Sequence, residues 1–255
     1  MIPKTIHYCW FGGNELPPLA KKCIKSWKKY CKDYKIIRWD ETNFDISSAP
    51  LYVRQAYEAK KWAFVTDYVR LWAMTKYGGI YMDTDVEVVK PLDQFLKHQA
   101  FSGFEDEINI PTGIMACEKN FVLFQKLLHF YDDAVFIKED GSIDTTNNVE
   151  IITDICIEKG LKRNNTFQEI EGFALYPNDF FCPKSYVDGI IRKTENTHTI
   201  HHFNASWLSK DSQEKKKERW RRKQKRAKQE ARRAKAKNTF IRVFGEKTYN
   251  KLRKK

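Results

Sequence analysis

Residues 64–86 read FVTDYVRLWAMTKYGGIYMDTDV, and this order of residue types decides the fold. The first half is apolar on most sides and ends at Gly78-Gly79, a pair that commonly terminates a helix. The β-prone residues 80–82 and two aspartates follow. The stretch therefore predicts a helix, a tight turn, a buried strand and a pair of carboxylates, in that order.

Five charged side chains lie in this largely apolar stretch, and four of them suggest a site. Asp67 and Arg70 are three residues apart and share a helix face, where apolar neighbours would bury them together as a functional pair or as a structural ion pair. Asp83 and Asp85 are expected on one face of the strand, because side chains alternate. Two carboxylates so close require a shared cation or proton, and hard oxygen ligands suit Mg²⁺ or Mn²⁺.

An Asp-x-Asp sequence alone is a weak signal, since it occurs by chance in many loops. The order of parts around residues 83–85 is more specific, and it resembles the Asp-x-Asp region of glycosyltransferases with a GT-A fold. The resemblance is closest to family 32, which includes capsular polysaccharide enzymes and fungal initiating mannosyltransferases, and is more distant to the clostridial glucosylating toxins. It covers roughly residues 1–208 and implies a Rossmann-like nucleotide-sugar transferase fold.

The rest of the chain alternates β-prone runs with helical patterns. This alternation predicts an α/β fold with a mostly parallel central sheet. The expected strands lie within 2–11, 34–39, 79–89, 101–104, 113–117 and 173–176, and the expected helices at 19–30, 51–59, 64–77, 121–136 and before 159.

The composition indicates a folded chain. Of its 255 residues, 42% are hydrophobic and 14% aromatic, which is enough for a sizeable core and excludes disorder throughout. The six cysteines show no Cys-x-x-Cys spacing, which favours reduced, partly buried thiols over disulfides or zinc ligands. Without a signal peptide or a long uncharged apolar run, the sequence predicts a cytoplasmic protein with no membrane span.

The formal net charge of +13 is unevenly distributed. From Lys210 to the end, 21 Lys and Arg stand against 5 Asp and Glu, which leaves 25 against 28 in residues 1–209. We therefore expect a catalytic domain over 1–208 and a basic helical tail over 209–255, made of a long basic helix and a short amphipathic one around residues 240–244.

Three interpretations of the tail are open. It is a solvated helix without a function, or it binds an anionic membrane surface, which would place the protein on the inner face of the membrane as a peripheral protein. The third is nucleic-acid binding, which the acidic body and the absence of a base-reading module disfavour.

Aromatic residues follow the first predicted strand. Tyr8 and Trp10 lie at its carboxyl end, where ligands of open α/β sheets collect, and they are either core residues or nucleotide contacts. The opening IPKTIHYCW is similar to the start of family 32 members, and this similarity favours nucleotide binding.

Two adjacent histidines close the predicted catalytic domain. At most one of His201 and His202 is expected to reach a metal, because adjacent strand residues point to opposite faces. The segment resembles the family's C-terminal signature, in which one residue completes the cation shell and a Ser-Trp pair, here Ser206 and Trp207, reaches the diphosphate or sugar. We expect His202 to be the ligand, with His201 as the next candidate.

Asn147 and Asn148 are helix caps or donor-sugar contacts; the Gly-Pro pair usual in the family is missing there.

The resemblance implies a metal-dependent, retaining sugar transfer from a nucleotide sugar, here expected to be a UDP-sugar. Asp85 and a histidine would hold the metal, with Asp83 binding it directly or through water, and Asp67 and Arg70 would hold the donor. Tyr81 would contact its ribose or phosphate. The acceptor would be a glycan or lipid-linked glycan of bacterial-type surface polysaccharide. The alternatives are a non-catalytic module that binds a nucleotide sugar or polysaccharide, and a basic-tailed RNA-binding protein.

Overall fold

The computed structural model describes residues 1–110, 113–146, 148–205 and 210–244. The chain divides into two compact units: residues 1–185 with 191–207 form the first, and residues 186–190 with 208–255 form the second. No helix within these described ranges is both long enough and apolar enough to cross a bilayer.

The first unit is built on a seven-stranded sheet with the order β2-β1-β3-β6-β5-β8-β7. Pairing is parallel between β1 and β2, β1 and β3, and β5 and β8, whereas β6 and β7 run antiparallel to their neighbours. Five strands therefore point the same way, which confirms the predicted α/β fold with a mostly parallel central sheet. The strands are β1 Thr5–Cys9, β2 Lys35–Trp39, β3 Gly79–Met82, β5 Ala100–Gly103, β6 Ile114–Cys117, β7 Gln168–Ile170 and β8 Phe173–Tyr176.

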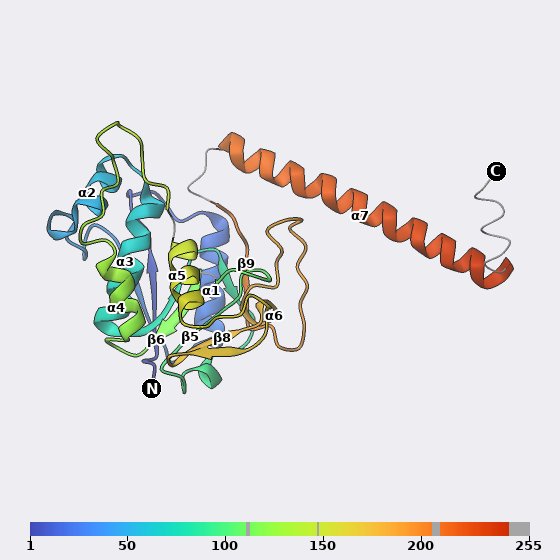
Figure 1. Ribbon diagram of the computed structural model, residues 1–255, viewed down its shortest axis with the longest axis horizontal. Helices are drawn as coiled ribbons and strands as arrows, with labels where there is room; N and C mark the ends of the chain where they lie inside the picture. The colour runs from blue at the N-terminus through green and yellow to red at the C-terminus, as the bar shows by residue number, and fades with distance from the viewer. Residues whose placement is uncertain (111–112, 147, 206–209, 245–255) are drawn as a thin grey trace. The chain divides into compact units, whose positions relative to one another are not determined.

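Helices cover both faces of the sheet (Figure 1). Alternate residues of each strand feed two hydrophobic cores, so Tyr81 packs on one side and Ile80 and Met82 on the other. The first core lies under α2 to α5 and the second under α1 and α6. The helices are α1 Pro18–Tyr30, α2 Leu51–Glu58, α3 Trp62–Tyr77, α4 Val122–His129, α5 Asn148–Glu158 and α6 Asn178–Phe181.

The Gly78-Gly79 turn ends α3 and starts β3, as predicted. Both residues have positive φ, 65° and 107°. A Cβ on Gly79 would lie 2.6 Å from the Thr5 carbonyl oxygen, and one on Gly78 would lie 2.7 Å from the Lys119 nitrogen. Only glycine meets both requirements here, which fixes how α3 packs on the sheet.

The strand predicted over residues 79–89 is broken into two. Strand β3 ends at Met82, and β4 (Val86–Val88) leaves the central sheet to pair with β9 (Thr199–His201). The break is a turn in which the Val86 N–H donates to the Asp83 carbonyl oxygen at 2.9 Å. Asp83 and Asp85 therefore do not lie on a strand as expected, although both side chains still face the same site.

Other differences are smaller. Helix α4 ends at His129, earlier than expected, and strand β7 was not predicted. All six cysteines are free and buried, as expected.

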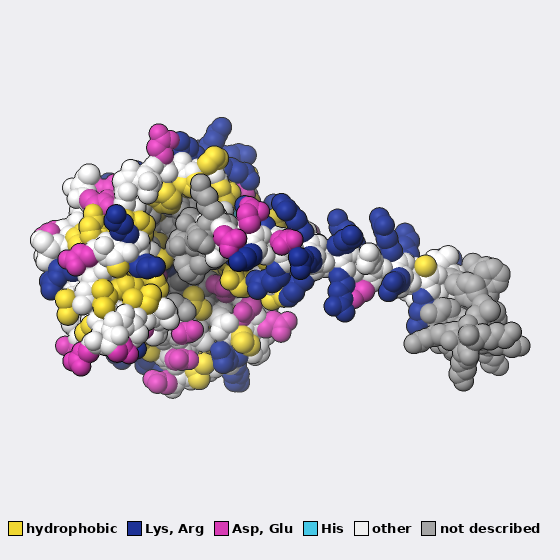
Figure 2. Space-filling view, turned by 90° about the horizontal axis from the view of Figure 1, so that it is seen from above, with side chains coloured by type: hydrophobic (Ala, Val, Ile, Leu, Met, Phe, Trp, Pro, Cys, Tyr) yellow, Lys and Arg dark blue, Asp and Glu magenta, His cyan; other side chains and the backbone are white. Residues whose placement is uncertain are grey.

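The second unit contains one long helix, α7 (Lys210–Phe244, 35 residues), where the sequence predicted two. Within this unit the loop 186–190 lies against the helix: the Trp220 Nε1–H donates to the Tyr186 carbonyl oxygen, and the Gln224 Nε2–H donates to that of Asp188, both at 2.8 Å. Lys and Arg side chains project along α7 (Figure 2).

His7 is a fully buried polar residue on β1. Its Nε2–H donates to the Gly78 carbonyl oxygen at 2.8 Å, and its Nδ1 accepts from the Trp39 indole N–H at 3.1 Å. The ring is therefore neutral with the proton on Nε2. Burial lowers the pKa of His7 to about 4.

We expect stability to fall in acid partly because of this residue. The unfolded chain binds a proton at His7 near pH 6.5, whereas the folded chain binds one only near pH 4. The free energy of unfolding that depends on neutral His7 is therefore fully present above pH 6.5 and is lost as pH falls to 4. It is on the order of 3 kcal/mol. Urea unfolding of His7→Gln should show a weaker pH dependence in this window than the wild type.

His129→Gln is the matched control, because His129 is exposed. If His7→Gln unfolds with the pH dependence of the wild type, the neutral buried imidazole does not account for the loss of stability in acid.

Candidate active site

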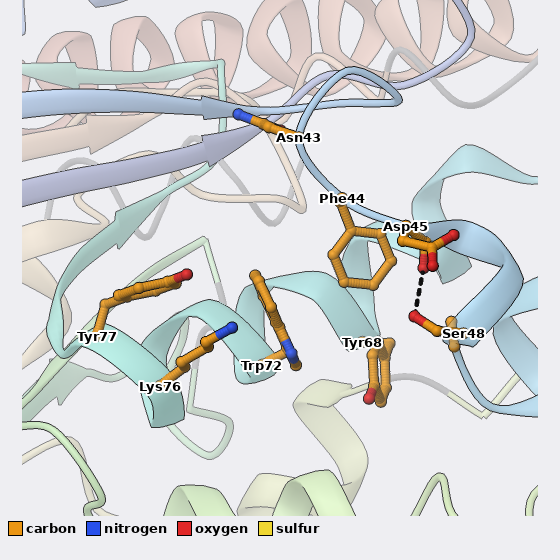
Figure 3. Close-up of a pocket in the computed structure, with 9 residues that line it drawn as sticks. Asn43, Phe44, Asp45, Ser48, Tyr68, Trp72, Lys76 and Tyr77 are labelled. Atoms are coloured by element: carbon orange, nitrogen blue, oxygen red, sulfur yellow. Dashed lines mark hydrogen bonds between the residues drawn. The ribbon is translucent and has the colours of Figure 1, made fainter.

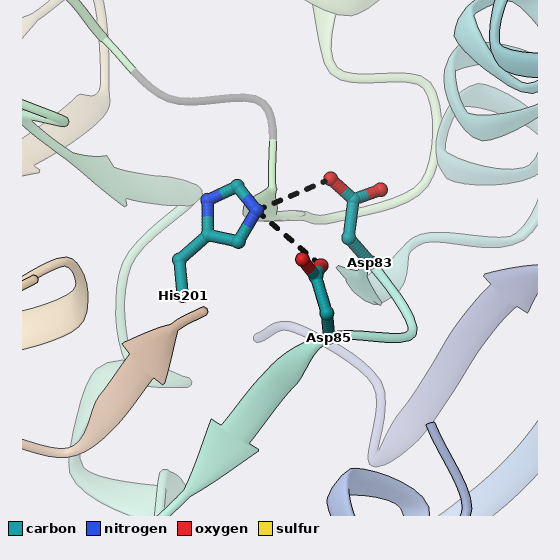
Figure 4. Close-up of side chains that lie close together, drawn as sticks. All are labelled: Asp83, Asp85 and His201. Carbon is teal, nitrogen blue, oxygen red and sulfur yellow. Dashed lines mark ion pairs between the residues drawn. The ribbon is translucent and has the colours of Figure 1, made fainter. Parts of the chain in front are cut away.

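Three side chains converge at the end of β3 (Figure 4). Nε2 of His201 lies 3.3 Å from Oδ1 of Asp85 and 4.0 Å from Oδ2 of Asp83. One ligand atom of each residue lies within 4.8 Å of the other two. The cluster is partly covered, with side-chain exposures of 13% for His201, 26% for Asp83 and 16% for Asp85.

The pairing of β4 with β9 brings His201 to the aspartates across more than a hundred residues of sequence. Val86 and His201 are partners in this ladder. The His202 N–H donates to the Asp85 carbonyl oxygen at 3.0 Å, and the Asn204 N–H donates to Asp85 Oδ2 at 2.6 Å. The closing segment therefore folds back onto the turn that carries Asp85, which the predicted metal site requires.

Arg70 connects α3 to the end of β3. It is 6% exposed, and its Nη2 lies 3.2 Å from Asp67 Oδ1 and 3.3 Å from Asp83 Oδ1. Its guanidinium also lies over the Tyr81 ring, 4.7 Å from the centroid, and the Tyr81 hydroxyl donates to the same Asp83 oxygen at 2.9 Å. The sequence left the Asp67–Arg70 pair as either a structural ion pair or part of a functional site. This geometry fits both, because the two residues form an ion pair and Arg70 also contacts Asp83.

Each aspartate of the cluster thus uses one oxygen within the protein and turns the other toward His201. Asp83 Oδ1 accepts from Tyr81 and contacts Arg70, while Oδ2 faces the imidazole. Asp85 Oδ2 accepts from the Asn204 backbone, while Oδ1 faces the imidazole. The two inward oxygens and Nε2 are left pointing at one another.

The charges at the site are strongly coupled. Burial opposes ionisation of Asp85, but the His201 charge and hydrogen bonds outweigh it and lower the pKa of Asp85 to about 2. Burial raises the pKa of Asp83 despite the nearby Arg70, and raises the pKa of Asp67 to about 6. Burial also opposes protonation of His201, yet the attraction of Asp85 raises its pKa well above the ordinary value.

The structure corrects the choice between the two histidines. His202, the preferred candidate, is directed away from the cluster: its Nε2 lies 2.8 Å from Oε2 of Glu87, which also pairs with Lys22. His201 contacts the aspartates instead. Adjacent residues at the end of β9 point to opposite faces, so only one of them reaches the site.

Two predicted nucleotide contacts are also corrected. Tyr81 is 1% exposed and its hydroxyl is bound to Asp83, so it positions that carboxylate and offers almost no surface to a ribose or phosphate. Tyr8 is 8% exposed and packs edge-on against Trp27, with ring centroids 5.6 Å apart. Trp10 is only partly buried, with its indole N–H donated to the Asn14 carbonyl oxygen at 2.7 Å. The predictions for Ser206, Trp207 and Asn147 fall outside the described residues.

The sequence did not single out Gly113, which packs against the cluster. A Cβ there would lie 2.9 Å from Nδ1 of His201 and 3.3 Å from Oδ2 of Asp83. The Gly113 carbonyl oxygen also accepts the Asp83 N–H at 2.8 Å. The sequence signal that could have identified it is a glycine directly before a β-prone run, because such a glycine often marks a place where another segment or a ligand approaches the backbone closely.

Asn148, whose function the sequence left open between two alternatives, lies 1% exposed beside α3. Its Nδ2–H donates to the Asp67 carbonyl oxygen at 2.8 Å, and its Oδ1 accepts from the Tyr131 hydroxyl at 2.6 Å. The side chain therefore anchors the α3 turn that carries Asp67.

The backbone after the histidines is constrained. Phe203 and Ala205 have φ values of 52° and 51°, in a region that non-glycine residues seldom adopt. The Asn204 N–H that binds Asp85 lies between them. Such conformations cost free energy and persist only where surrounding contacts hold them, as they do at many functional sites.

The donor set of the cluster fits a divalent cation. Two carboxylate oxygens and one imidazole nitrogen are ligands that Mn²⁺ accepts readily, whereas Mg²⁺ prefers oxygen and retains waters. A cation would take the place of the proton on His201 and relieve the like-charge contact between Asp83 and Asp85.

Comparison with known proteins agrees with this site. Residues 17–102 match the family described as "Glycosyltransferase sugar-binding region containing DXD motif", and the match includes α3, β3, Asp83 and Asp85. With the relatives below, it supports a glycosyltransferase similar to those of family 32, as the sequence predicted.

Two curated relatives are similar to the chain. An inositol phosphoceramide mannosyltransferase of Schizosaccharomyces pombe is 30% identical over 122 residues, which are 46% of this chain and 34% of the relative. An uncharacterised glycosyltransferase of Acanthamoeba polyphaga mimivirus is 26% identical over 215 residues, 76% of this chain and 82% of the relative. The chain spans about a third of the length of the S. pombe relative.

Among solved structures, the PaToxG glycosyltransferase has a TM-score of 0.49 and 18% identity, covering 62% of this chain and 69% of that one. The galactosyltransferase LgtC, in complex with donor and acceptor sugar analogs, has a TM-score of 0.43 and 15% identity, covering 85% and 95%.

We expect Gly113→Ala to weaken Mn²⁺ binding roughly 10- to 100-fold, the range typical of changes next to metal ligands. The added methyl group forces His201 or Asp83 to move. Isothermal titration calorimetry with MnCl₂ measures the effect. Gly141→Ala is the control, because a methyl group there meets nothing within 4 Å and only the positive φ is strained. Equal affinities in the two variants would show that Gly113 does not shape the site.

Proposed function

We propose that this protein transfers a sugar from a nucleotide-sugar donor to a glycan or lipid-linked glycan, with retention of configuration and with Mn²⁺ or Mg²⁺ as cofactor. The observation that carries the proposal is that one ligand atom from each of Asp83, Asp85 and His201 lies within 4.8 Å of the other two. Two of these residues belong to the matched DXD region, and the third is delivered by β9.

A divalent cation at this cluster offsets the negative charge that develops on the departing nucleoside diphosphate. The chain's own residues prepare the cluster for it. Asp85 stays ionised because its pKa is about 2, and the Asn204 N–H fixes its second oxygen. Arg70 and Tyr81 hold Asp83 from the opposite side, so that its free oxygen remains directed inward.

The Asp67–Arg70 pair is the proposed holder of the donor sugar. The Asp67 side chain is 13% exposed and would accept a hydrogen bond from a hydroxyl of the donor sugar, while Arg70 places a positive charge beside it. Because Arg70 also contacts Asp83, a shift of this pair moves the cluster as well. Binding of the sugar and binding of the cation are therefore expected to depend on each other.

The proposed stereochemical course is front-face substitution, in which the acceptor attacks on the side of the leaving group. Among the described residues, the carboxylates gathered at the site are Asp67, Asp83 and Asp85, and all three are engaged by Arg70 or His201. None of them is available as a nucleophile without disrupting these contacts. A covalent glycosyl-enzyme is therefore disfavoured.

A UDP-sugar is the proposed donor, and bacterial-type surface polysaccharide synthesis is the proposed setting. The name of the S. pombe relative specifies a mannosyltransferase, so GDP-mannose is a second donor to be tested. The proposed domain division, a catalytic domain over 1–208 and a tail over 209–255, accompanies this assignment.

We expect the protein to hydrolyse at least one UDP- or GDP-sugar slowly in the presence of MnCl₂, and EDTA to abolish this. Asp85→Asn should reduce the rate roughly 100-fold or more, since it removes charge stabilisation of the leaving group. Release of UDP or GDP is measured across a panel of nucleotide sugars. Asp106→Asn, in an exposed turn, is the control.

Two outcomes contradict the proposal. Absence of both binding and hydrolysis across the panel, with or without the metal, removes the enzyme assignment. Undiminished binding in Asp83→Asn and Asp85→Asn, together with no turnover in the wild type, favours a non-catalytic module that holds a nucleotide sugar or polysaccharide.

The tail is proposed to bring the protein to an anionic membrane surface, as a peripheral protein on the cytoplasmic side. Between Arg221 and Lys237 there are ten Lys and Arg and one acidic residue, Glu230, and this part of α7 is almost entirely exposed (Figure 2). The described side chains form no broad apolar face, so attraction to lipid headgroups is the main source of binding. The side chains of Phe240 and Phe244 lie outside the described part.

We expect the wild type to float with vesicles that contain phosphatidylglycerol and not with vesicles of phosphatidylcholine alone. Replacing four basic residues of α7 with Gln should weaken binding on the order of 10³-fold, at about 1 kcal/mol for each charge. The replaced residues are Arg221, Lys225, Arg232 and Arg233.

A variant with four lysines of the α1 region replaced is the control for net charge. These are Lys25, Lys28, Lys29 and Lys32. Equal loss of flotation in both variants would show that total charge, rather than α7, is responsible. Salt-dependent RNA binding that requires α7, without flotation, would support the nucleic-acid alternative instead.

A further inference from the structure

A pocket of about 370 Å³ lies on the outer side of α3 and is not part of the Asp83–Asp85–His201 cluster (Figure 3). Its volume falls within the roughly 300–1,000 Å³ typical of small-ligand sites. Both α3 and the loop after β2 contribute to it. The lining residues are Asn43, Phe44, Asp45, Ser48, Ala49, Tyr68, Trp72, Lys76 and Tyr77.

Helix α3 therefore presents two faces with different chemistry. Tyr68, Trp72 and Lys76 are spaced by four residues and form one stripe that lines the pocket. Asp67 and Arg70 lie on a different face and contact each other and Asp83. A ligand in the pocket would not contact the proposed cation site.

Aromatic rings form much of the pocket wall. Trp72 packs edge-on against Phe44 with centroids 5.0 Å apart, and Tyr77 stacks on Trp39 at 5.5 Å. The Lys76 ammonium lies 4.8 Å from the Trp72 centroid and 5.4 Å from that of Tyr77 (Figure 3). The negative ring faces thus already attract a group of positive potential.

The polar groups of the pocket are incompletely used. Within the described part of the chain, the Tyr68 hydroxyl, the Trp72 indole N–H and the Tyr77 hydroxyl have no hydrogen-bond partner. The Tyr68 hydroxyl and the Trp72 N–H are not among the fully buried polar atoms that lack a partner, so solvent or a ligand can reach them. Asp45 and Ser48 also line the pocket, but Asp45 Oδ1 accepts from Ser47 and the Ser48 hydroxyl donates to the Asp45 carbonyl oxygen, so Asp45 Oδ2 is the acceptor left for a ligand.

We propose that this pocket binds a pyranose ring of the glycan acceptor, as a subsite separate from the transfer centre. The C–H face of a pyranose carries weak positive potential and fits an aromatic wall, while its hydroxyls bind the unpaired donors and Asp45. The choice of a glycan over other small polar ligands rests on the proposed function.

The charge of the pocket disfavours other ligands. Among the described residues that line it, Lys76 is the one cation and Asp45 the one anion, so these residues do not form the basic cluster that a diphosphate requires. A quaternary ammonium ion also fits aromatic walls, but the positive charge of Lys76, which lies near the Trp72 and Tyr77 rings, would repel it. A neutral ring with hydroxyls avoids both conflicts.

Such a subsite would hold a growing chain at a second point. A glycan long enough to occupy the pocket and the transfer centre together would bind more tightly than a short one, because its second contact is intramolecular. Methyl glycosides would still bind the pocket alone, without donor or metal.

The test is an NMR titration of the full chain with methyl glycosides of galactose, glucose and mannose and with their oligosaccharides, in EDTA and without donor. We expect the indole N–H resonance of Trp72, assigned with Trp72→Phe, to shift. Tyr77→Ala should weaken binding about tenfold or more; Tyr77 is 41% exposed but also stacks on buried Trp39, so the unfolding midpoint of the variant is measured to confirm that it folds. Phe130→Ala, at an exposed aromatic residue 45% accessible outside the pocket, is the control.

The outcomes separate this inference from the proposed function. Binding lost in Tyr77→Ala but kept in Asp83→Asn supports the subsite, even if no donor is hydrolysed. Binding lost in Asp83→Asn but kept in Tyr77→Ala places the sugar at the transfer centre and overturns it. Absence of a Trp72 shift with any saccharide, or a shift with tetramethylammonium only, also overturns it.

Discussion

The antiparallel pairing of β4 with β9 is the constraint on which the site depends. It joins the turn after β3 to a strand more than a hundred residues later, and it brings His201 Nε2 within 3.3 Å of Asp85. Two backbone donors secure the contact, from His202 to the Asp85 carbonyl oxygen and from Asn204 to its carboxylate. Without this ladder, His201 would not lie beside Asp83 and Asp85.

Arg70 is the second connection, and it links the site to the helical layer. A guanidinium that contacts Asp67 and Asp83 couples α3 to the end of β3, and Asn148 secures α3 from the far side through the Asp67 carbonyl oxygen. Buried pairs of this kind are costly to desolvate and contribute little net stability, but removing one partner is strongly destabilising. The arrangement therefore favours precise geometry over stability.

Much of the fold could be predicted from local pattern. The helix predicted over 64–77 and found over 62–77, its glycine terminator and the β-prone run that follows were predicted from residue types alone, because spacing and glycine conformation act over a few residues. The break after Met82 could not be predicted, because β-propensity continues to Val89. The chain changes its pairing partner there, to β9, and the last bond to the central sheet is made to the Gly113 carbonyl oxygen. For the same reason α4 was predicted too long and β7 was missed.

The sequence by itself determined the class of fold, the pairing of two carboxylates with a closing histidine segment, and the contrast between an acidic body and a basic tail. Tertiary structure decided which histidine meets the aspartates, because that depends on which face β9 turns inward. It also decided that the buried Tyr81 positions Asp83, and that the absence of a side chain at Gly113 leaves room for the His201 ring. These are contacts between segments distant in sequence, and no local preference of a residue encodes them.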